Sequence, residues 1–199
     1  MVNQAEYSIS LRSKVLLFEF RGNTVCNIEE GLGIFNCMWA SDSRQILLFT
    51  TFKMTAYNLS DGTTSWFKSV KSTAKGCVFS NCGKFMALAE RKDCKDSVGI
   101  YFVNGWKLLN YFSLNETQDL AGLVWAPNNS FLVAWDCHLH YKLIPICLLN
   151  GVLSKGTACE DPIMGIKNVI YSHNSLLLAV GSYDEKIRIL NAMTWKLVG

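Results

Sequence analysis

Short apolar runs separated by polar turn residues recur along most of the chain, and they predict β-strands. Residues 169–191 show the pattern most fully: a strand that ends at Tyr171, a polar turn, an apolar strand at 176–180, a second turn around Asp184, and an alternating apolar-polar strand. Alternation with a period of two indicates a strand with two unlike faces, and a short apolar run between turns indicates a buried strand. Because no segment of 11–18 residues keeps a helical period, the sequence predicts an all-β fold.

The same arrangement occurs four times at nearly constant spacing. Each copy has an aromatic residue at the end of its first predicted strand, at Trp39, Phe79, Trp125 and Tyr171, and the intervals are 40, 46 and 46 residues. A period of about 40–45 residues with four short strands per unit is typical of the blades of a WD40 β-propeller. We therefore interpret the four aromatic residues as structural anchors at equivalent inner-strand positions, where blade packing explains them better than base stacking.

The repeats divide the chain as follows. Residues 1–13 are polar and are expected to be loose, and residues 14–199 are expected to form a partial WD40 propeller. The predicted repeats are 14–33 (a half blade), 34–70, 74–112, 120–154 and 164–199. We expect an incomplete ring of about four blades plus a half blade, and we interpret the chain as a fragment, a truncated gene model or a short splice form of a larger propeller.

The repeats depart from the common WD40 motif. The Gly-His pair that usually precedes the inner strand is missing, and Leu190-Asn191 stands where Trp-Asp usually ends the third strand. Trp135-Asp136 is present, but aligning Trp125 with Tyr171 places it at the end of a second strand, so we do not interpret it as the signature dipeptide. Asp184 occupies the turn position in which the family's structural aspartate normally lies.

Three segments are more particular than the repeat pattern. Residues 86–96, 117–136 and 178–196, which include Ala126-Pro127 and Trp135-Asp136, resemble the WD-repeat protein 8 family. This resemblance implies a non-enzymatic scaffold at the centrosome and spindle pole, in the cytoplasm and cytoskeleton. It also implies binding to a coiled-coil centrosomal anchoring protein, with a kinesin-14 motor as partner in some lineages, and a role in attaching microtubule minus ends to the mitotic spindle.

Composition excludes several other classes of protein. With 19 basic and 16 acidic residues the net charge is +3, too mild for a nucleic-acid-binding protein. No apolar run approaches the 18 or so residues of a membrane helix, so no membrane insertion is expected. The first residues do not resemble a signal peptide, and the eight cysteines form no CxxC pair. The sequence therefore favours a cytosolic or nuclear protein.

No motif in the chain predicts catalysis or a cofactor. His138 and His140 could share one face of a strand, with Cys137 or Asp136 nearby, but residues two apart on one strand supply only two of the four ligands that zinc needs. There is no G-x-S-x-G elbow and no phosphate-binding glycine loop. We expect no enzyme activity, no metal and no cofactor.

Two polar segments are the candidates for partner binding. Residues 90–96 are expected to form a long charged loop between two strands, with charges too dense to be buried, and residues 115–119 a second loop on the same face. Loops on a rigid scaffold are where recognition residues usually lie, although a solvated loop would show the same composition. The candidate residues are Arg91, Lys92, Asp93, Lys95, Asp96, Glu116 and Asp119. The alternative function, a scaffold of an RNA-associated or other cytoplasmic complex, would need a basic face, and the mixed charges of these loops argue against RNA.

Overall fold

The computed structural model describes residues 7–11, 14–18, 24–29, 33–51, 53–149 and 152–198, and before Gly33 it describes the backbone alone. All regular structure in these ranges is β-strand, and all pairs of named strands are antiparallel. The chain divides into two compact units, Met1–Val70 and Lys71–Gly199. Each unit is described by itself below.

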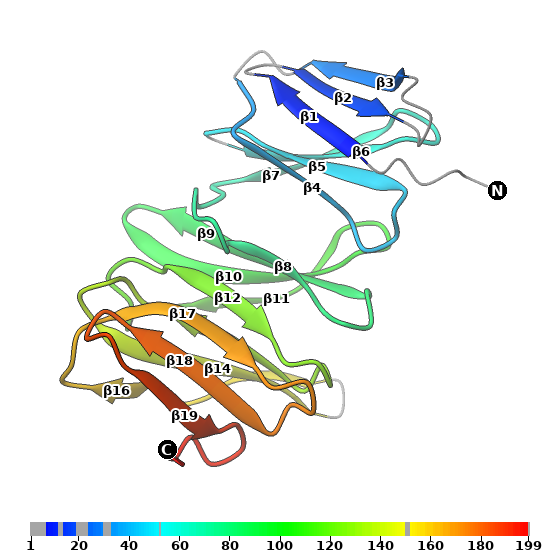
Figure 1. Cartoon of the computed structure of the whole chain (residues 1–199). Helices are drawn as coiled ribbons and strands as arrows, with labels where there is room; N and C mark the ends of the chain where they lie inside the picture. The colour runs from blue at the N-terminus through cyan, green and yellow to red at the C-terminus, as the bar shows by residue number, and fades with distance from the viewer. Residues whose placement is uncertain are drawn as a thin grey trace. The chain divides into compact units, whose positions relative to one another are not determined.

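The first unit contains two sheets (Figure 1). One has the strand order β1-β2-β3, and the other has the order β4-β5-β6-β7. The strands are β1 (Tyr7–Leu11), β2 (Lys14–Phe18), β3 (Thr24–Glu29), β4 (Asn36–Trp39), β5 (Gln45–Phe49), β6 (Lys53–Asn58) and β7 (Thr64–Lys68). Within this unit Ile34, Ile46 and Leu48 form a buried cluster against which the half-buried Trp39 packs.

The second unit contains three sheets, with the orders β11-β10-β9-β8, β12-β13-β14-β15 and β17-β18-β19. A short strand, β16, pairs with the beginning of β14. The strands are β8 (Cys77–Phe79), β9 (Phe85–Lys92), β10 (Lys95–Phe102), β11 (Lys107–Ser113), β12 (Gly122–Trp125), β13 (Phe131–Trp135), β14 (Tyr141–Leu149), β15 (Val152–Lys155), β16 (Cys159–Asp161), β17 (Ile166–Tyr171), β18 (Leu177–Ser182) and β19 (Ile187–Asn191).

The turn between the first and second strands has the same geometry in four sheets. In each, the residue after the first strand donates its backbone N–H to the carbonyl of the residue that begins the second, as Ala126 does to Phe131 at 2.7 Å. The third turn residue has a positive φ, and these residues are Ser43 (55°), Gly83 (70°), Asn129 (62°) and Ser175 (62°). Their intervals of 40, 46 and 46 residues equal those of the aromatic residues, each of which ends the first strand of its sheet.

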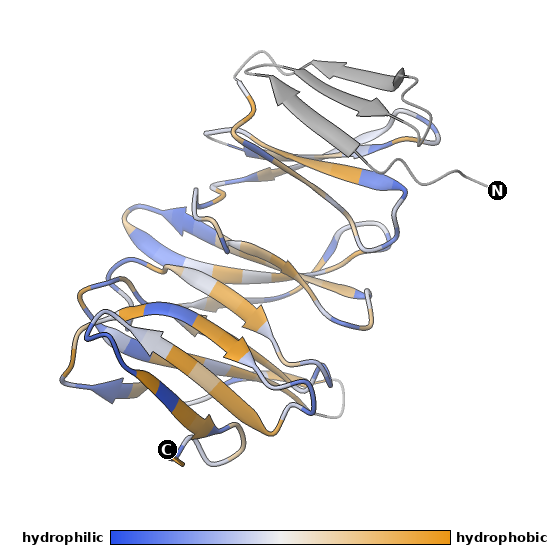
Figure 2. Cartoon of the chain, in the orientation of Figure 1, coloured by the Kyte–Doolittle hydropathy of each residue, from blue (hydrophilic) through white to orange (hydrophobic). Residues whose placement is uncertain are grey.

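In the second unit the middle sheet is buried on both faces, because successive side chains of a strand point to opposite sides. Phe131, Val133 and Trp135 of β13 pack in one core with residues of β17–β19. Leu132 and Ala134 of the same strand pack in a second core with residues of β8–β11. Figure 2 shows hydrophobic colour over much of β18, one of the strands that pack on this sheet. This face-to-face stacking of four-stranded and three-stranded sheets is how neighbouring propeller blades pack.

Three elements differ from the sequence prediction. Within the segment expected to be loose, Tyr7–Leu11 is a strand paired with β2, while residues 1–6 and 12–13 lie outside the described part. The alternation of Tyr7, Ile9 and Leu11 with serines is the strand signal that the polar composition concealed. The first predicted half blade is accordingly a three-stranded sheet. Conversely, the outer strand expected at the end of the last repeat is reduced to a single bridge between Leu190 and Leu197.

Candidate functional site

The candidate site is one end of the second unit, where several connections between strands are joined by hydrogen bonds. They are the β9–β10 turn, the β11–β12 connection at 114–121, the β13–β14 connection at 136–140, the segment 162–165 and the β18–β19 turn at 183–186. Backbone bonds link neighbours along this series: Gly165 N–H donates to the His138 carbonyl, and Tyr183 N–H donates to the Gly165 carbonyl, both at 3.0 Å. The predicted partner-binding residues all lie in the first two connections or on the strands that lead to them.

Residues 90–96 do not form the long loop that the sequence predicted. Strands β9 and β10 run through them, and the turn consists of Asp93 and Cys94 alone, both with positive φ (50° and 59°). Such a two-residue turn fits the twist of a hairpin. The expectation that the charges stay in solvent is also wrong for two of them, because Glu90 and Asp96 are 9% and 3% exposed. Tyr101 O–H donates to Glu90 at 2.7 Å, and burial raises the pKa of this carboxyl group.

Asp96 is the centre of a buried charge cluster. Lys71 Nζ lies 3.0 Å from both of its carboxylate oxygens, and Arg91 Nη1 lies 3.4 Å from one of them. Asp96 also accepts the backbone N–H of Leu120 at 2.6 Å. Asp119 closes the cluster: it accepts hydrogen bonds from Lys71 at 2.6 Å and from Arg91. Arg91, Asp96 and Asp119 therefore come together, but their role is structural. With Lys71 they form a cluster, called the clasp below, that links the β11–β12 connection to the β9–β10 hairpin.

The same cluster sets the ionisation of Asp119, whose side chain is 61% exposed. The hydrogen bond from Lys71 lowers the pKa of this carboxyl group against the opposing effect of burial. The positive charges of Lys71 and Arg91 lower it further. Asp119 is thus held as a carboxylate that faces solvent on one side and two cations on the other.

Asp136 is a structural residue that the sequence interpretation missed. It is fully buried, and it accepts backbone N–H bonds from Gln118 (3.0 Å), Asp119 (2.9 Å) and Cys137 (2.9 Å). Its predicted position at the end of a second strand is where the structure has it, directly after β13. The repeat alignment gives no signal for this role, because aligning Trp125 with Tyr171 places Asp136 opposite Ser182 rather than opposite Asp184.

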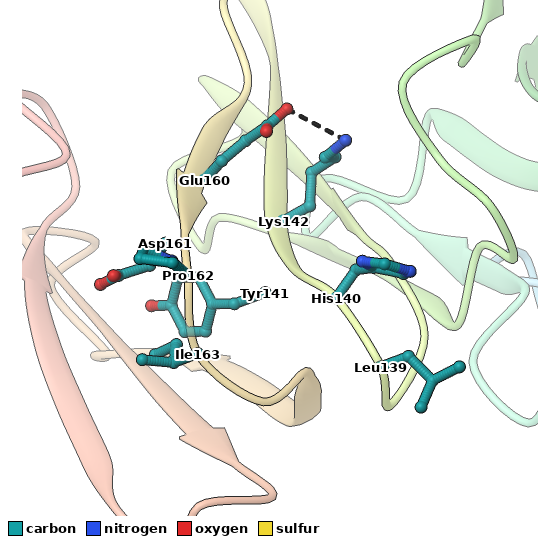
Figure 3. A pocket seen from close by; sticks show the side chains of 8 residues that line it. All are labelled: Leu139, His140, Tyr141, Lys142, Glu160, Asp161, Pro162 and Ile163. Atoms are coloured by element: carbon teal, nitrogen blue, oxygen red, sulfur yellow. Dashed lines mark ion pairs between the residues drawn. The ribbon is translucent and has the colours of Figure 1, made fainter.

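Glu116 belongs to a separate ion pair. Lys155 Nζ lies 2.7 Å from Glu116 Oε1, and Lys142 donates to the Glu116 carbonyl at 2.6 Å and pairs with Glu160 at 3.0 Å. Burial raises the pKa of Glu116, but the hydrogen bonds from Lys155 and from the backbone outweigh this effect, so the pKa is lowered overall. Figure 3 shows Lys142 and Glu160 at one wall of a pocket of about 460 Å³ bounded by residues 139–142 and 160–163.

The remaining predicted residues are free for contact. Lys92, Asp93 and Lys95 are exposed, and among the described residues they form no ion pair. Figure 2 shows this end of the hairpin in hydrophilic colour. Apolar side chains are exposed further along the same series of connections: Leu139 (62%), Met164 (56%) and Tyr183 (46%).

His138 and His140 lie in the β13–β14 connection and do not form a metal site. His138 is exposed and its ring packs edge-on against Tyr183, with centroids 5.9 Å apart. Among the described residues no group of three His, Cys, Asp or Glu side chains could hold a metal ion. Nor does any described segment form a helix long and apolar enough to cross a membrane.

Asp184, the predicted repeat anchor, lies in the β18–β19 turn. Arg188 Nη2 pairs with Asp184 Oδ2 at 2.5 Å, and the Arg188 guanidinium lies 5.7 Å from the centroid of the Tyr141 ring. The hydrogen bond from Arg188 holds the pKa of Asp184 well below its ordinary value. All of its hydrogen bonds, including those from Ser182 and Lys186, stay within its own turn.

Comparison with known proteins identifies the repeat. The mouse WD repeat-containing protein WRAP73 is 41% identical over 176 residues, which cover 87% of this chain and 38% of the relative. The chain is thus similar in sequence to a WD-repeat protein. It spans about two fifths of the length of the curated relative it matches. No protein-family model matches the chain.

Solved structures agree on the fold. The β-propeller domain of Cps50 (Swd1) from Myceliophteria thermophila superposes with a TM-score of 0.68 at 10% identity, covering 96% of this chain and 67% of that one. A functionally unknown protein from Desulfotomaculum acetoxidans superposes with a TM-score of 0.63 at 15% identity, covering 94% and 63%. The predicted fold class, an all-β, incomplete WD40-type propeller, is confirmed.

Proposed function

We propose that this WD-repeat chain is a non-enzymatic scaffold that binds a protein partner through the connections at the exposed end of its second unit. The observation that carries the proposal is the arrangement of charge there. Buried hydrogen bonds to Asp96 and Asp136 hold the β11–β12 connection in place, while Lys92, Asp93 and Lys95 beside it are exposed and form no ion pair with any residue that the structure describes. A rigid base under free side chains is the arrangement that recognition surfaces use.

The full-length protein, in this proposal, acts in a centrosome and spindle-pole complex that anchors microtubule minus ends and supports assembly of the mitotic spindle. The partner is a coiled-coil centrosomal anchoring protein, with a kinesin-14 motor as a second partner. The resemblance of residues 86–96, 117–136 and 178–196 to the WD-repeat protein 8 family supports this role. Two of those three segments supply the clasp and the free charges beside it.

The alternative, an RNA-associated scaffold, is less well supported by this surface. Its free charges are of both signs, since Lys92, Lys95 and Lys186 alternate with Asp93 and Glu185. Non-specific RNA binding needs a continuous basic track with several stacking aromatic residues. Mixed charge beside exposed Leu139 and Met164 suits a protein surface better.

The test reverses the free charges and leaves the clasp intact. In the full-length protein we expect the pair Lys92→Glu and Lys95→Glu to weaken co-precipitation of the coiled-coil partner and recruitment to spindle poles, at unchanged expression. The matched control is the pair Lys68→Glu and Lys196→Glu, which makes the same change of charge at two exposed lysines outside the candidate site. The control separates a local contact from a general effect of net charge.

Arg91 and Asp96 are excluded from this test because changing them would disturb the fold as well as the surface. If the Lys92/Lys95 variant binds and localises as the control does, the partner does not use this hairpin. If both variants lose binding equally, the effect is one of overall charge and the proposed surface fails.

A further inference from the structure

A second surface of the second unit has the properties of a docking groove. It lies where the outer strand β11 of one sheet approaches β15 of the next, and it encloses about 430 Å³. Its lining is largely apolar and includes Phe85, Leu109, Trp125, Val152 and Leu153. Ligand sites of this volume, lined by apolar groups with a few polar atoms, are common on proteins.

The rim of the groove keeps apolar side chains in solvent. Val152 is 66% exposed, and Leu108, Leu109 and Tyr111 of β11 are 46%, 44% and 45% exposed. Both β11 and β15 are edge strands, at the ends of their sheets. Contiguous exposed apolar groups next to a depression mark interaction sites on soluble proteins.

The wall of the groove contains a hydrogen-bond donor without an acceptor. Trp125 is 7% exposed, its ring stacks on Phe85 with centroids 6.5 Å apart, and its buried Nε1 has no hydrogen-bond partner among the described residues. Buried indole N–H groups usually find an acceptor, because leaving one unpaired costs about 1–3 kcal/mol. An oxygen atom delivered by a bound segment would satisfy it once the side chains that cover Nε1 move aside.

The charge around the groove is of one sign. Lys84 immediately precedes Phe85 in the chain. Phe102 pairs with Phe85 on one side and with Lys107 on the other. Two exposed lysines therefore flank the end of the groove at Phe85. No aspartate or glutamate occurs in residues 80–85, 102–113, 125–130, 145–149 or 152–155, which form this end. At the other end Lys155 is neutralised by Glu116. A partner with acidic residues is therefore complementary to this surface.

We propose that this groove binds an acidic protein segment with apolar anchor residues. An aliphatic or aromatic side chain of the segment enters between Leu109 and Val152, a carbonyl or carboxylate oxygen accepts the Trp125 Nε1–H bond, and flanking carboxylates face Lys84 and Lys107. This surface is separate from the free lysines of the β9–β10 hairpin, so it does not depend on the function proposed above.

The experiment uses three fluorescein-labelled peptides of 14 residues that share one pattern of two residue types. The first contains leucine and glutamate, the second replaces each glutamate with lysine, and the third replaces each leucine with serine. Binding to the whole chain is followed by fluorescence anisotropy, and the Nε1–H signal of Trp125, assigned with Trp125→Phe, is followed by ¹⁵N NMR. We expect the leucine-glutamate peptide alone to bind and to shift the Trp125 signal. Equal binding of all three peptides, or none by the first, overturns the proposal.

Surface variants locate the binding. Two changes should each weaken binding of the leucine-glutamate peptide by about tenfold, which corresponds to about 1.4 kcal/mol. One is Val152→Asp, at a position too exposed to affect folding, and the other is the pair Lys84→Glu and Lys107→Glu. The pair Lys92→Glu and Lys95→Glu should leave it unchanged. If the hairpin pair abolishes binding and the groove variants do not, the peptide binds at the hairpin and the groove is not a site.

Discussion

Three aspartates lie near the link between the second and third strands of three consecutive sheets, and they do different things: Asp96 is the second residue of β10, Asp136 directly follows β13, and Asp184 lies in the β18–β19 turn. Asp96 and Asp136 are 3% and 0% exposed, and both accept backbone N–H groups from the β11–β12 connection. The side chain of Asp184 is 20% exposed, and its hydrogen bonds go to Ser182, Lys186 and Arg188 of its own turn. The three aspartates thus lie at the same end of their sheets, but they differ in their exact place in the repeat and in their partners.

The difference in partners shows that these carboxylates have two structural roles. In the two buried cases the carboxylate joins elements: Asp96 reaches from the β9–β10 hairpin to Leu120, and Asp136 reaches from the end of β13 to Gln118 and Asp119. The connection between two sheets is therefore held from both sides. In the third case the carboxylate orders a single turn, with Arg188 as its counter-ion.

The largest effect should follow Asp96→Ala. This change leaves the Leu120 N–H without its acceptor and removes the buried carboxylate beside Lys71 and Arg91, which keep Asp119 as a partner. Breaking a buried pair costs about 3–5 kcal/mol when the remaining charge is uncompensated, so we expect a loss of about 3 kcal/mol, at the lower end of this range. Urea unfolding followed by tryptophan fluorescence measures the loss. Asp96→Asn, which keeps an acceptor for Leu120, should lose less. A midpoint for Asp96→Ala equal to that of the unchanged chain would contradict the joining role.

Asp136→Ala should have the second largest effect. It removes the acceptor of three backbone N–H groups but leaves no charge unpaired, so the expected loss is about 1–3 kcal/mol for the groups left buried and unsatisfied. Hydrogen exchange should accelerate at Gln118 and Asp119, and Asp136→Asn, which retains one acceptor oxygen, should restore part of the protection. Unchanged exchange at both amides would mean that the connection is held by Asp96 alone.

The strands and their repeat could be predicted because both depend on local sequence. Apolar runs such as 131–135 give buried strands, and the spacing of Trp39, Phe79, Trp125 and Tyr171 reappears as the spacing of the positive-φ turn residues. What these four anchors share is their place at the end of the first strand. Their burial differs, since Trp125 and Tyr171 are buried whereas Trp39 and Phe79 are half-buried.

The charge cluster could not be predicted, because it depends on partners far apart in the chain. Lys71 and Asp96 are 25 residues apart and Lys71 and Asp119 are 48 residues apart, so composition alone made residues 90–96 look like a solvated loop. Strands β9 and β10 continue through this segment, and in this way they place Arg91 and Asp96 next to the β11–β12 connection. The resemblance of residues 178–184 to a WD40 turn pointed to Asp184, the aspartate with the most local role.

The smallest effect should follow Asp184→Ala. Its side chain is partly exposed, and exposed ion pairs contribute little because solvent and salt screen them. Arg188 lowers the pKa of Asp184 below its ordinary value near 3.8, so the carboxylate stabilises the fold above that value and loses its contribution as the pH falls below it. Thermal unfolding of the variant and of the unchanged chain should therefore differ slightly at pH 7 and converge on acidification or at high salt.

Arg188→Ala is the matched variant for the same pair, and it should show the same convergence at low pH. A loss for Asp184→Ala as large as that for Asp96→Ala would show that Asp184 also joins elements, and the distinction between the three aspartates would fail.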